Sequence, residues 1–509
     1  MKAFLMHRDQ DFFLPREPPA NQEALTQDLE LTTLFDAMAG GDEFLFEVAR
    51  TAVLSSLTDP EAIVYRQQVL ADCQDQPSVV IDLYNLAVEA IGAQKRIWRS
   101  FLSSPDSVLN WSVQLLELFV SALRRLRGLA DEHAGSFRSE GFNRFFAMLA
   151  SELDDQYLAT VEGHLKELKF RRGVLISAAL GKGNKGIRYV LRRAPEQKGW
   201  MQRLSVANRS GLSFQIADRD ENGFRALSEL RGRGINLVAN AAARSADHIL
   251  SFFSMLRAEL GFYVGCLNLR ERLAAKQEPT CFPVPDAPGE PTLSASGLYD
   301  VCLSLSVEAR VVGNHLDADN RRLVMITGAN QGGKSTFLRS VGLAHLMMQC
   351  GMFVPAESFR AGVSAGVFTH YKREEDATMT SGKLDEELSR MGDIAGRIRP
   401  GCILLCNESF ASTNEREGSE IARQIVRALT EAGIKVLYVT HLFDLAHGFY
   451  REQAHTAMFL RAERQADGRR TFRLVEGAPL ATSYGEDLYR RIFGSALDAV
   501  PTAGSDRRP

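Results

Sequence analysis

The sequence predicts a multidomain protein in which a helical first part is followed by an α/β second part. Over residues 249–267, apolar side chains recur every three or four positions, the spacing of one helix face. After residue 293, short apolar runs typical of buried strands alternate with helical patterns, which indicates a parallel sheet covered on both faces. Between the two parts, residues 277–292 contain five prolines, which are compatible with neither a helix nor a central strand. This stretch predicts a linker.

The composition excludes several classes of protein. Apolar residues make up 45% and charged residues 24% of the chain, as in ordinary globular proteins. The 60 Lys and Arg residues face 63 Asp and Glu residues, so nucleic-acid binding would need a local basic patch. No run of about 18 apolar residues is present, and the start of the chain lacks the apolar stretch of a signal peptide, so we expect no membrane partner. The seven cysteines are scattered without a CxxC pair, which favours reduced thiols in a cytoplasmic protein.

The predicted helical region, residues 1–276, is interrupted by a basic insert at about 173–210 that reads as two short strands around a Gly/Asn turn. Residues 166–209 hold twelve basic and two acidic side chains. A solvated positive face and a patch that contacts phosphates both fit this excess. If DNA binds here, the candidate residues are Lys182, Lys185, Arg188, Arg192 and Arg193.

Residues 328–335 fit the pattern G-x-x-x-x-G-K-[ST] between a predicted strand, 323–327, and a predicted helix, 336–349. Glycines let the backbone fold tightly, so that N–H groups and the positive end of the helix dipole face phosphate oxygens. The lysine reaches the β- and γ-phosphates, and the serine hydroxyl is a ligand for Mg²⁺. The pattern predicts a P-loop ATPase domain over residues 293–495 that uses ATP and Mg²⁺. Its phosphate-binding residues are Gly328, Ala329, Asn330, Gln331, Gly332, Gly333, Lys334, Ser335 and Thr336.

Two further strand ends complete the predicted site. Asn407 and Glu408 follow the apolar run 402–406, at the sheet edge where ligands bind. A P-loop ATPase usually has Asp then Glu there. Asn407 can still accept a hydrogen bond near Mg²⁺ beside Ser335, but it supplies no counter-charge, so we expect slow turnover. Glu408 is the candidate that orients or deprotonates water, and His441, after the run 435–440, can bond a γ-phosphate oxygen or that water.

These motifs resemble the DNA mismatch-repair MutS family of ABC-type ATPases. Six elements occur in the family's order over about 160 residues: 327–339 (TGxNxGGKSTxLR), 351–356 (GxxVPA), 378–383 (the Ser/Gly signature loop), 407–418 (DExxxGTSxxxG), 440–445 (THxxEL) and 483–485 (SYG). The helical part is similar more loosely to the family's core and lever region. The resemblance implies an ABC-type ATPase domain behind a helical core and lever.

The resemblance also implies a homodimer, in which Ser381 and Gly382 of the signature loop act on the partner's nucleotide. An ordinary helix N-cap at Thr380 or Ser381 fits the same residues. The chain departs from the family at Asn407 and has no Phe-x-Glu wedge near its start, so we expect a short MutS-like protein without the mismatch-binding domain. Residues 496–509 predict a flexible tail.

Two functions fit these residues. The first is a DNA-associated ATPase of repair or recombination, which binds and hydrolyses ATP at a dimer interface. The second is a slowly hydrolysing, nucleotide-gated scaffold for protein partners. Chromosome-organising and transporter ATPases are excluded by the short spacing between the two ATP motifs and by the lack of LSGGQ. The base of the nucleotide is expected near residues 311–314.

Overall fold

The computed structural model describes residues 1–14, 18–97, 104–171, 173–193, 215–373, 382–465 and 470–480. The chain forms two compact units that interleave along the sequence. The first contains residues 1–4, 78–138 and 142–260, and the second contains residues 5–77, 139–141 and 261–509. Helix α10 (Glu221–Ala275) belongs to both, because the boundary falls between Leu260 and Gly261.

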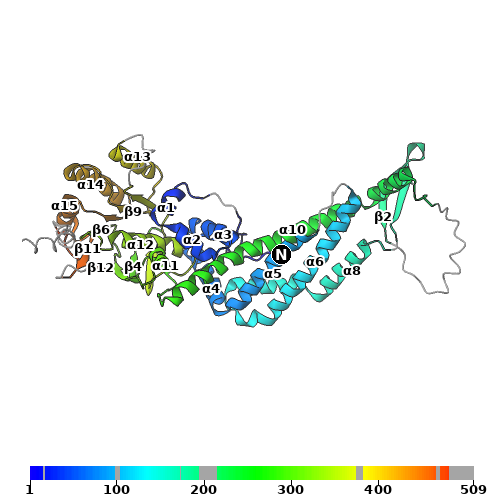
Figure 1. The fold of residues 1–509 in the computed structure, drawn as a ribbon, viewed down its shortest axis with the longest axis horizontal. Coiled ribbons are helices and arrows are strands. Elements are labelled where there is room, and N and C mark those ends of the chain that lie inside the picture. The colour runs from blue at the N-terminus through cyan, green and yellow to red at the C-terminus, as the bar shows by residue number, and fades with distance from the viewer. Residues whose placement is uncertain are drawn as a thin grey trace, which may run out of the picture. The chain divides into compact units, whose positions relative to one another are not determined.

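The first unit is helical and carries one β-hairpin (Figure 1). Its other elements are α5 (Pro77–Arg96), α6 (Pro105–His133), η1 (Ala134–Ser136), α7 (Glu140–Glu152), α8 (Asp155–Leu168), β1 (Leu175–Leu180), η2 (Lys182–Asn184) and β2 (Gly186–Arg192).

Helix α6 shows why this sequence forms long helices. Ser104 caps its first turn through a reciprocal bond with Ser107, and proline stands at the first helical position, where no N–H is needed. The apolar face of α6 packs against α10: the rings of Phe119 and Phe253 lie 6.0 Å apart, and both are fully buried. This helix-on-helix core agrees with the three- and four-residue spacing of the sequence.

The hairpin of β1 and β2 is antiparallel, from Leu175 opposite Arg192 to Leu180 opposite Gly186. Gly183 in its turn has φ of +70°, a conformation that glycine adopts without a side-chain clash. The hairpin lies within the basic insert of the sequence. Residues 194–210 of that insert lie outside the described residues.

The described part of the second unit contains two sheets. The larger has the strand order β12-β11-β6-β10-β9-β8, and its strands are parallel apart from β12, which runs antiparallel to β11. The smaller has the order β3-β7-β4-β5. The strands are β3 (Val284–Asp286), β4 (Leu293–Leu298), β5 (Asn314–Asp317), β6 (Leu323–Thr327), β7 (Ser358–Gly362), β8 (Val367–Tyr371), β9 (Ile403–Asn407), β10 (Lys435–Val439), β11 (Met458–Arg464) and β12 (Arg470–Glu476). The proline-rich stretch thus contributes an edge strand, β3, where a missing donor is tolerated.

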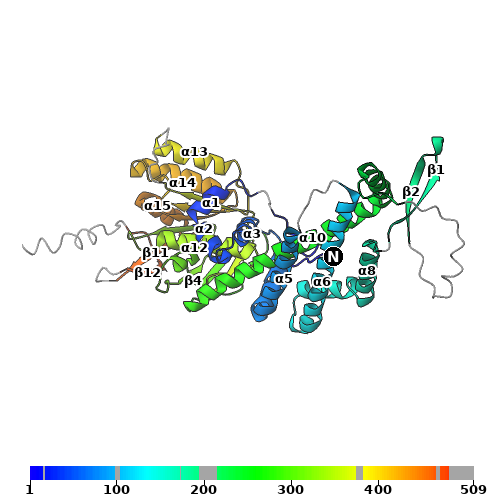
Figure 2. The same ribbon diagram turned by 45° about the vertical axis from the view of Figure 1, so that its right-hand side comes forward.

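Helices cover both faces of the larger sheet. Its central strands alternate, so that Leu404 and Cys406 of β9 pack on the side of α13 (Lys383–Ala395), α14 (Glu415–Glu431) and α15 (Phe443–Gln453). Leu405 faces α12 (Lys334–Gln349) on the other side, close to Gly342. Both views show α13, α14 and α15 on the side away from α12 (Figures 1 and 2). This is the two-faced covering that the uninterrupted apolar strands predict.

The beginning of the chain packs against the α/β part. The second unit includes α1 (Gln22–Asp28), α2 (Leu31–Ala39), α3 (Glu43–Leu54), α4 (Pro60–Asp75) and α11 (Val301–Ser306). The side chain of Asn21 donates to the carbonyl of Val367 at 2.8 Å, and α2 packs on α11. The region predicted as helical, residues 1–276, therefore contributes to both compact units.

Among the described residues, one helix is long and apolar enough for a membrane span. It is α10, and 67% of the apolar window is buried inside the structure, as in the core helix of a folded domain.

Candidate functional site

A loop of glycines joins the end of β6 to the start of α12. Gly328, Gln331 and Gly333 have φ of +111°, +58° and +86°, so the backbone turns repeatedly through the left-handed region. A Cβ on Gly328 would lie 2.8 Å from the backbone nitrogen of Ala462, and one on Gly332 would lie 2.6 Å from the Cβ of Ala462. The loop can follow this path only with glycine at positions 328 and 332, where a Cβ would clash. We call residues 328–333 the glycine loop.

Lys334 begins α12 directly after this loop. Its Nζ donates to the carbonyls of Gly328 and Ala329, at 3.1 and 3.0 Å. Burial lowers the pKa of Lys334 to about 8, although the carboxylate of Glu408 favours the charged form. The ammonium group is thus held inside the curl of the loop by neutral acceptors, which phosphate oxygens would replace with stronger, charged ones.

This pKa leads to a prediction for the pH dependence of nucleotide affinity. Lys334 is cationic below about pH 8 and neutral above it, because its pKa is lowered from 10.5. Affinity for an ATP analogue should stay level from pH 6.5 to 7.5 and fall above pH 8, approaching about tenfold per pH unit. Isothermal titration calorimetry across this range measures it. An affinity that is flat up to pH 10 would contradict the assignment of Lys334 as the charged phosphate ligand.

Ser335 and Asn407 meet at the carboxyl edge of the larger sheet. The Ser335 hydroxyl donates to the Asn407 amide oxygen at 2.9 Å, although the two residues come from α12 and β9. Two neutral oxygens at this separation suit a hard cation such as Mg²⁺, which takes hydroxyl and amide oxygens as ligands. The donor set fits the ion in kind but brings no negative charge, so Mg²⁺ would be held mainly by the phosphates.

Glu408 and His441 form the second pair at this edge. His441 Nε2 lies 3.1 Å from Glu408 Oε1, and both side chains are about one-third exposed. The hydrogen bond from His441 lowers the pKa of Glu408, against a rise from partial burial, so Glu408 is a carboxylate at neutral pH. Glu408 has φ of +55°, and its N–H donates to Val439 at 2.9 Å. The backbone therefore projects this carboxylate from the end of β9 in a conformation that a non-glycine residue seldom adopts.

A buried polar cluster holds the residue after Glu408. His370 Nδ1 lies 2.7 Å from the Ser409 hydroxyl, and the Tyr438 hydroxyl donates to the Ser409 carbonyl at 2.6 Å. Burial lowers the pKa of His370 to about 4, so its ring is neutral when it bonds to the Ser409 hydroxyl. The ring also stacks on Phe410, with 5.4 Å between centroids. The spacing of motifs in the sequence does not predict this support.

A cavity of about 520 Å³ opens beside the glycine loop. Gln331, Gly333 and Thr336 line one side of it. The other side is formed by Tyr299, Asp300, Arg310, Val311, Val312, Asn314 and Phe472. This volume and its apolar walls suit a nucleoside.

The wall of this cavity joins the smaller sheet to the β11–β12 hairpin. Asn314 donates to the carbonyl of Phe472 at 3.2 Å and accepts from the N–H of Leu474 at 2.8 Å. Phe472 stays 49% exposed. Residues 311–314 were expected near the base from the sequence. Tyr299 and Phe472 were not, because Tyr299 follows β4 and Phe472 lies in β12, and the sequence does not reveal that these segments are neighbours in space.

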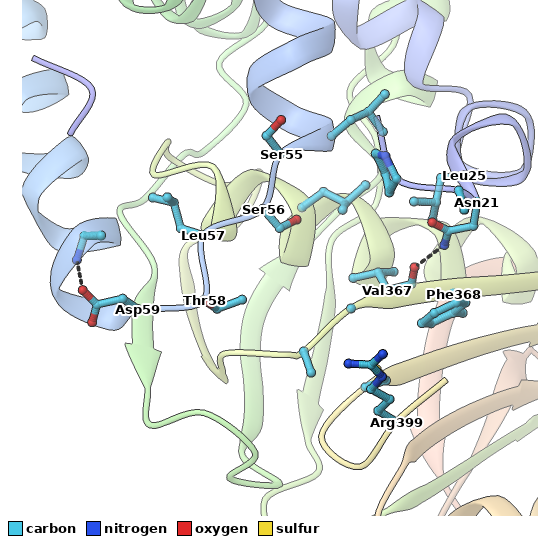
Figure 3. A pocket seen from close by; sticks show the side chains of 18 of the residues that line it. Asn21, Leu25, Ser55, Ser56, Leu57, Thr58, Asp59, Val367, Phe368 and Arg399 are labelled. Carbon is cyan, nitrogen blue, oxygen red and sulfur yellow. Dashed lines mark hydrogen bonds between the residues drawn. The ribbon is translucent and has the colours of Figure 1, made fainter. Parts of the chain in front are cut away.

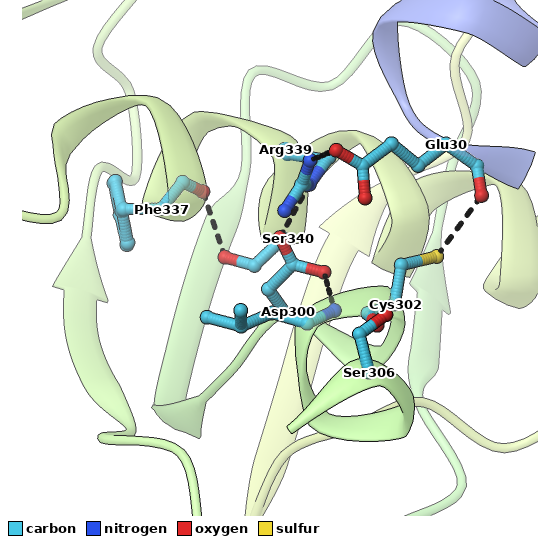
Figure 4. Close-up of polar contacts among 8 residues, drawn as sticks. Glu30, Asp300, Cys302, Ser306, Phe337, Arg339 and Ser340 are labelled. Carbon is cyan, nitrogen blue, oxygen red and sulfur yellow. Dashed lines mark hydrogen bonds and ion pairs between the residues drawn. The ribbon is translucent and has the colours of Figure 1, made fainter. Parts of the chain in front are cut away.

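The helix that follows the loop is anchored by a partly buried ion-pair network (Figure 4). The guanidinium of Arg339 pairs with the carboxylates of Asp300 and Glu30, and the Cys302 thiol lies 3.4 Å from the carbonyl of Glu30. Burial raises the pKa of Asp300 against the opposing effect of Arg339, and its Oδ1 accepts from Leu303 N–H at 3.0 Å. This network ties the start of the chain and the cavity wall to α12. Removing one partner of such a pair would leave a buried charge uncompensated.

The remaining predicted residues lie elsewhere. Gly382 is the N-cap of α13, while Ser381 lies outside the described residues. On the hairpin, Arg193 pairs with Glu167 at 2.6 Å and Arg192 donates to the Ser177 hydroxyl at 2.9 Å.

The other candidate DNA residues, Lys182, Lys185 and Arg188, are exposed on the same hairpin. Arg192 and Arg193 are bonded to nearby acceptors. Lys182, Lys185 and Arg188 therefore form the more accessible positive face of the hairpin.

A larger cavity, of about 980 Å³, lies at the opposite edge of the sheet (Figure 3). Its lining includes Val367 and Cys402, at the amino ends of β8 and β9, together with Arg399 and the loop of residues 55–59. Parallel sheets bind nucleotides at the carboxyl ends of their strands, where the glycine loop, Asn407 and His441 meet. The smaller cavity, beside the glycine loop, is the one that lies at this edge.

Comparison with known proteins matches two domain families. The family model of the MutS2 N-terminal domain matches residues 58–276, and that of MutS domain V matches residues 324–493. The chain carries MutS-family domains. The glycine loop, Asn407, Glu408 and His441 all fall within the match to MutS domain V.

Individual relatives are similar over part of their length. The DNA mismatch repair protein MutS of Thermotoga neapolitana is 34% identical over 186 residues, which are 36% of this chain and 23% of that protein. The MutS of Syntrophomonas wolfei is 33% identical over 153 residues, 30% of this chain and 18% of the relative. The endonuclease MutS2 of Lacticaseibacillus casei is 29% identical over 221 residues, 42% and 26% of the two chains. The MutS-like chain thus spans about a quarter or less of these relatives.

Proposed function

We propose that this protein is a Mg²⁺-dependent ATPase whose nucleotide state controls DNA binding in repair or recombination. The observation that carries the proposal is the meeting of four side chains at one sheet edge. Lys334 and Ser335 lie in the first turn of α12, directly after the glycine loop. Glu408 and His441 come from two neighbouring strand ends. The match to MutS domain V over the same residues supports it.

The chain's own groups supply positioning and electrostatics. Backbone N–H groups of the glycine loop and the start of α12 hold the phosphates, and Lys334 neutralises the charge that develops on the γ-phosphate. Glu408 accepts a hydrogen bond from water and orients it toward phosphorus, and the bond from His441 holds that carboxylate in place. Mg²⁺, held by the phosphates with Ser335 and Asn407, would stabilise negative charge on the phosphate oxygens.

The neutral Asn407 favours a slow reaction. Its amide oxygen accepts from Ser335 as an aspartate would, but without a charge to retain the metal. This residue also supports a second function, a nucleotide-gated scaffold for protein partners, in which ATP stabilises an interface more than it is consumed.

The family resemblance extends the proposal to a homodimer. Ser381 and Gly382 would reach the nucleotide of the partner subunit from the start of α13. Gly382 caps α13 without a side-chain hydrogen bond.

DNA binding is proposed for the hairpin of β1 and β2. Lys182, Lys185 and Arg188 are exposed there, and the segment from 166 to 209 has a large excess of basic residues. A basic surface that contacts phosphates releases counterions, so its affinity falls with salt.

This leads to a test with a set of duplex, mismatched, branched and single-stranded DNA, with and without ATP. Changing Lys182, Lys185 and Arg188 together to glutamine should weaken binding to all bound forms. It should also reduce the slope of log affinity against log salt by up to about three, one for each phosphate contact. Fluorescence anisotropy from 50 to 300 mM salt measures both.

The matched control changes Arg416, Arg427 and Arg451, on α14 and α15, to glutamine and should leave the slope unchanged. Equal slopes for the two triple variants would remove the hairpin from the DNA interface. If the parent protein binds no DNA even at low salt, the scaffold function is favoured.

A further inference from the structure

The residues directly after helix α10 form hydrogen bonds to the wall of the cavity beside the glycine loop. Lys276, one residue beyond the helix, donates from Nζ to the carbonyls of Ser304 and Val307. Glu278 Oε1 accepts from the Ser304 hydroxyl at 3.2 Å and from the N–H of Val311 at 2.9 Å. Two oppositely charged side chains from one turn therefore hold both ends of the segment 304–311.

The backbone directly after α10 places the side chains of Lys276 and Glu278 beside this segment. Gln277 has φ of +56°, which ends the helical path, and the N–H of Glu278 bonds back to the carbonyl of Leu273 at 3.1 Å. The side chain of Glu278 is 1% exposed, so the carboxylate is directed inward rather than into solvent. Arg310 approaches its Oε2 at 3.5 Å and is the charged partner of this carboxylate.

The segment 304–311 begins in α11 and leaves regular secondary structure after Ser306. Residues 307–313 form neither helix nor strand, yet Val307, Arg310, Val311 and Val312 line the cavity beside the glycine loop. Hydrogen bonds to a charged group contribute more than neutral ones, so Glu278 and Lys276 are both strong constraints on this wall.

Tyr299 stands in the same wall with an unused hydroxyl. It is 2% exposed and lines the cavity, and within the described part of the chain neither its Oη nor Glu278 Oε2 has a hydrogen-bond partner. Burial and the nearby Glu278 raise the pKa of Tyr299, so the hydroxyl stays protonated and able to donate. Glu278 thus bonds to the segment 304–311 and also lies near the Tyr299 hydroxyl, a donor without a hydrogen-bond partner among the described residues. The wall at residues 298–314 also falls between the two family matches, which end at residue 276 and begin at residue 324.

We propose that Glu278 and Lys276 are positioning residues for the nucleoside of bound ATP: they fix the wall formed by 304–311 and so set the affinity for the base and sugar but not for the phosphates. The inference rests on the proposed ATP site. It assigns the two ends of the nucleotide to separate parts of the chain, with the triphosphate on the glycine loop and the nucleoside on a wall held by the end of α10.

The test compares a nonhydrolysable ATP analogue with inorganic tripolyphosphate, which carries the phosphates without a nucleoside. Glu278→Gln keeps the size of the side chain and removes its charge. It should weaken binding of the analogue about tenfold or more, the scale of a lost charged hydrogen bond, and leave tripolyphosphate binding unchanged. Glu290→Gln, an exposed acid in the proline-rich stretch, is the matched control and should change neither.

Isothermal titration calorimetry gives both affinities, and melting curves report whether each variant is folded. If Glu278→Gln does not fold, Lys276→Gln is judged by the same criterion, since it removes the ammonium group that bonds to the carbonyls of Ser304 and Val307. Equal weakening of both ligands, or of neither, overturns the positioning role. A parent protein that binds neither ligand overturns the ATP site itself, whereas Lys334→Ala in the same assay should weaken both ligands.

Discussion

Lys334→Ala is expected to weaken ATP binding by about a hundredfold or more, the largest effect of any single change in this chain. The Lys334 ammonium lies inside the glycine loop, and its removal takes away the one cation that this loop holds among the described residues. Charged hydrogen bonds contribute about 1.5–3 kcal/mol each, and Lys334 could make two of them to the β- and γ-phosphates. Equilibrium titration with a fluorescent ATP analogue measures the loss.

The comparison for this variant is Lys95→Ala, which removes an exposed lysine of α5 and should bind as the parent does. The melting temperature of Lys334→Ala should stay close to that of the parent, because burial already disfavours its charge in the folded protein. Identical affinities for Lys334→Ala and the parent would mean that the glycine loop does not hold the triphosphate.

Glu408→Gln is expected to lower the hydrolysis rate by about 10²–10⁴ and to leave ATP binding nearly unchanged. Glutamine keeps the length of the side chain and an oxygen that can accept from His441, but it cannot accept a proton from water. The pKa of Glu408 is lowered by that hydrogen bond, so the parent holds the required carboxylate throughout the neutral range. Single-turnover hydrolysis at saturating ATP separates this chemical step from binding.

Glu420→Gln, on the exposed side of α14, serves as the control for loss of one negative charge and should hydrolyse ATP at the parental rate. Full activity of Glu408→Gln would remove Glu408 from its role. If the parent itself shows no turnover above background but binds ATP, the neutral Asn407 has the stronger influence and the scaffold function is supported.

The parts of the site that could be predicted were those fixed by local geometry. The glycine loop was predictable because its spacing and the strand and helix around it are contiguous in the sequence. Asn407, Glu408 and His441 were predictable as a group because parallel strands end at the same edge of a sheet, and β9 and β10 are indeed neighbours.

The supporting residues could not be predicted, since their partners are distant in the chain. Arg339 belongs to a recognisable motif, but nothing in the sequence indicated that it pairs with Asp300 and Glu30. The cavity wall combines Tyr299, directly after β4, with Phe472 of β12, 173 positions later in the chain. The hydrogen bond from Val311 to Glu278 could not be predicted either, because the proline-rich stretch around Glu278 predicted only a linker.

The pairing of Glu30 with Arg339 also has a consequence for how the protein is made. The two residues are separated by 309 positions, and Leu29 beside the first contacts α12 beside the second. Part of the surface that buries α1 and α2 comes from β8 and α11, which are synthesised more than 260 residues later. Contacts of such long sequence separation form late. We therefore expect the apolar side chains of α1 and α2 to be fully covered only after the α/β part of the chain has been synthesised.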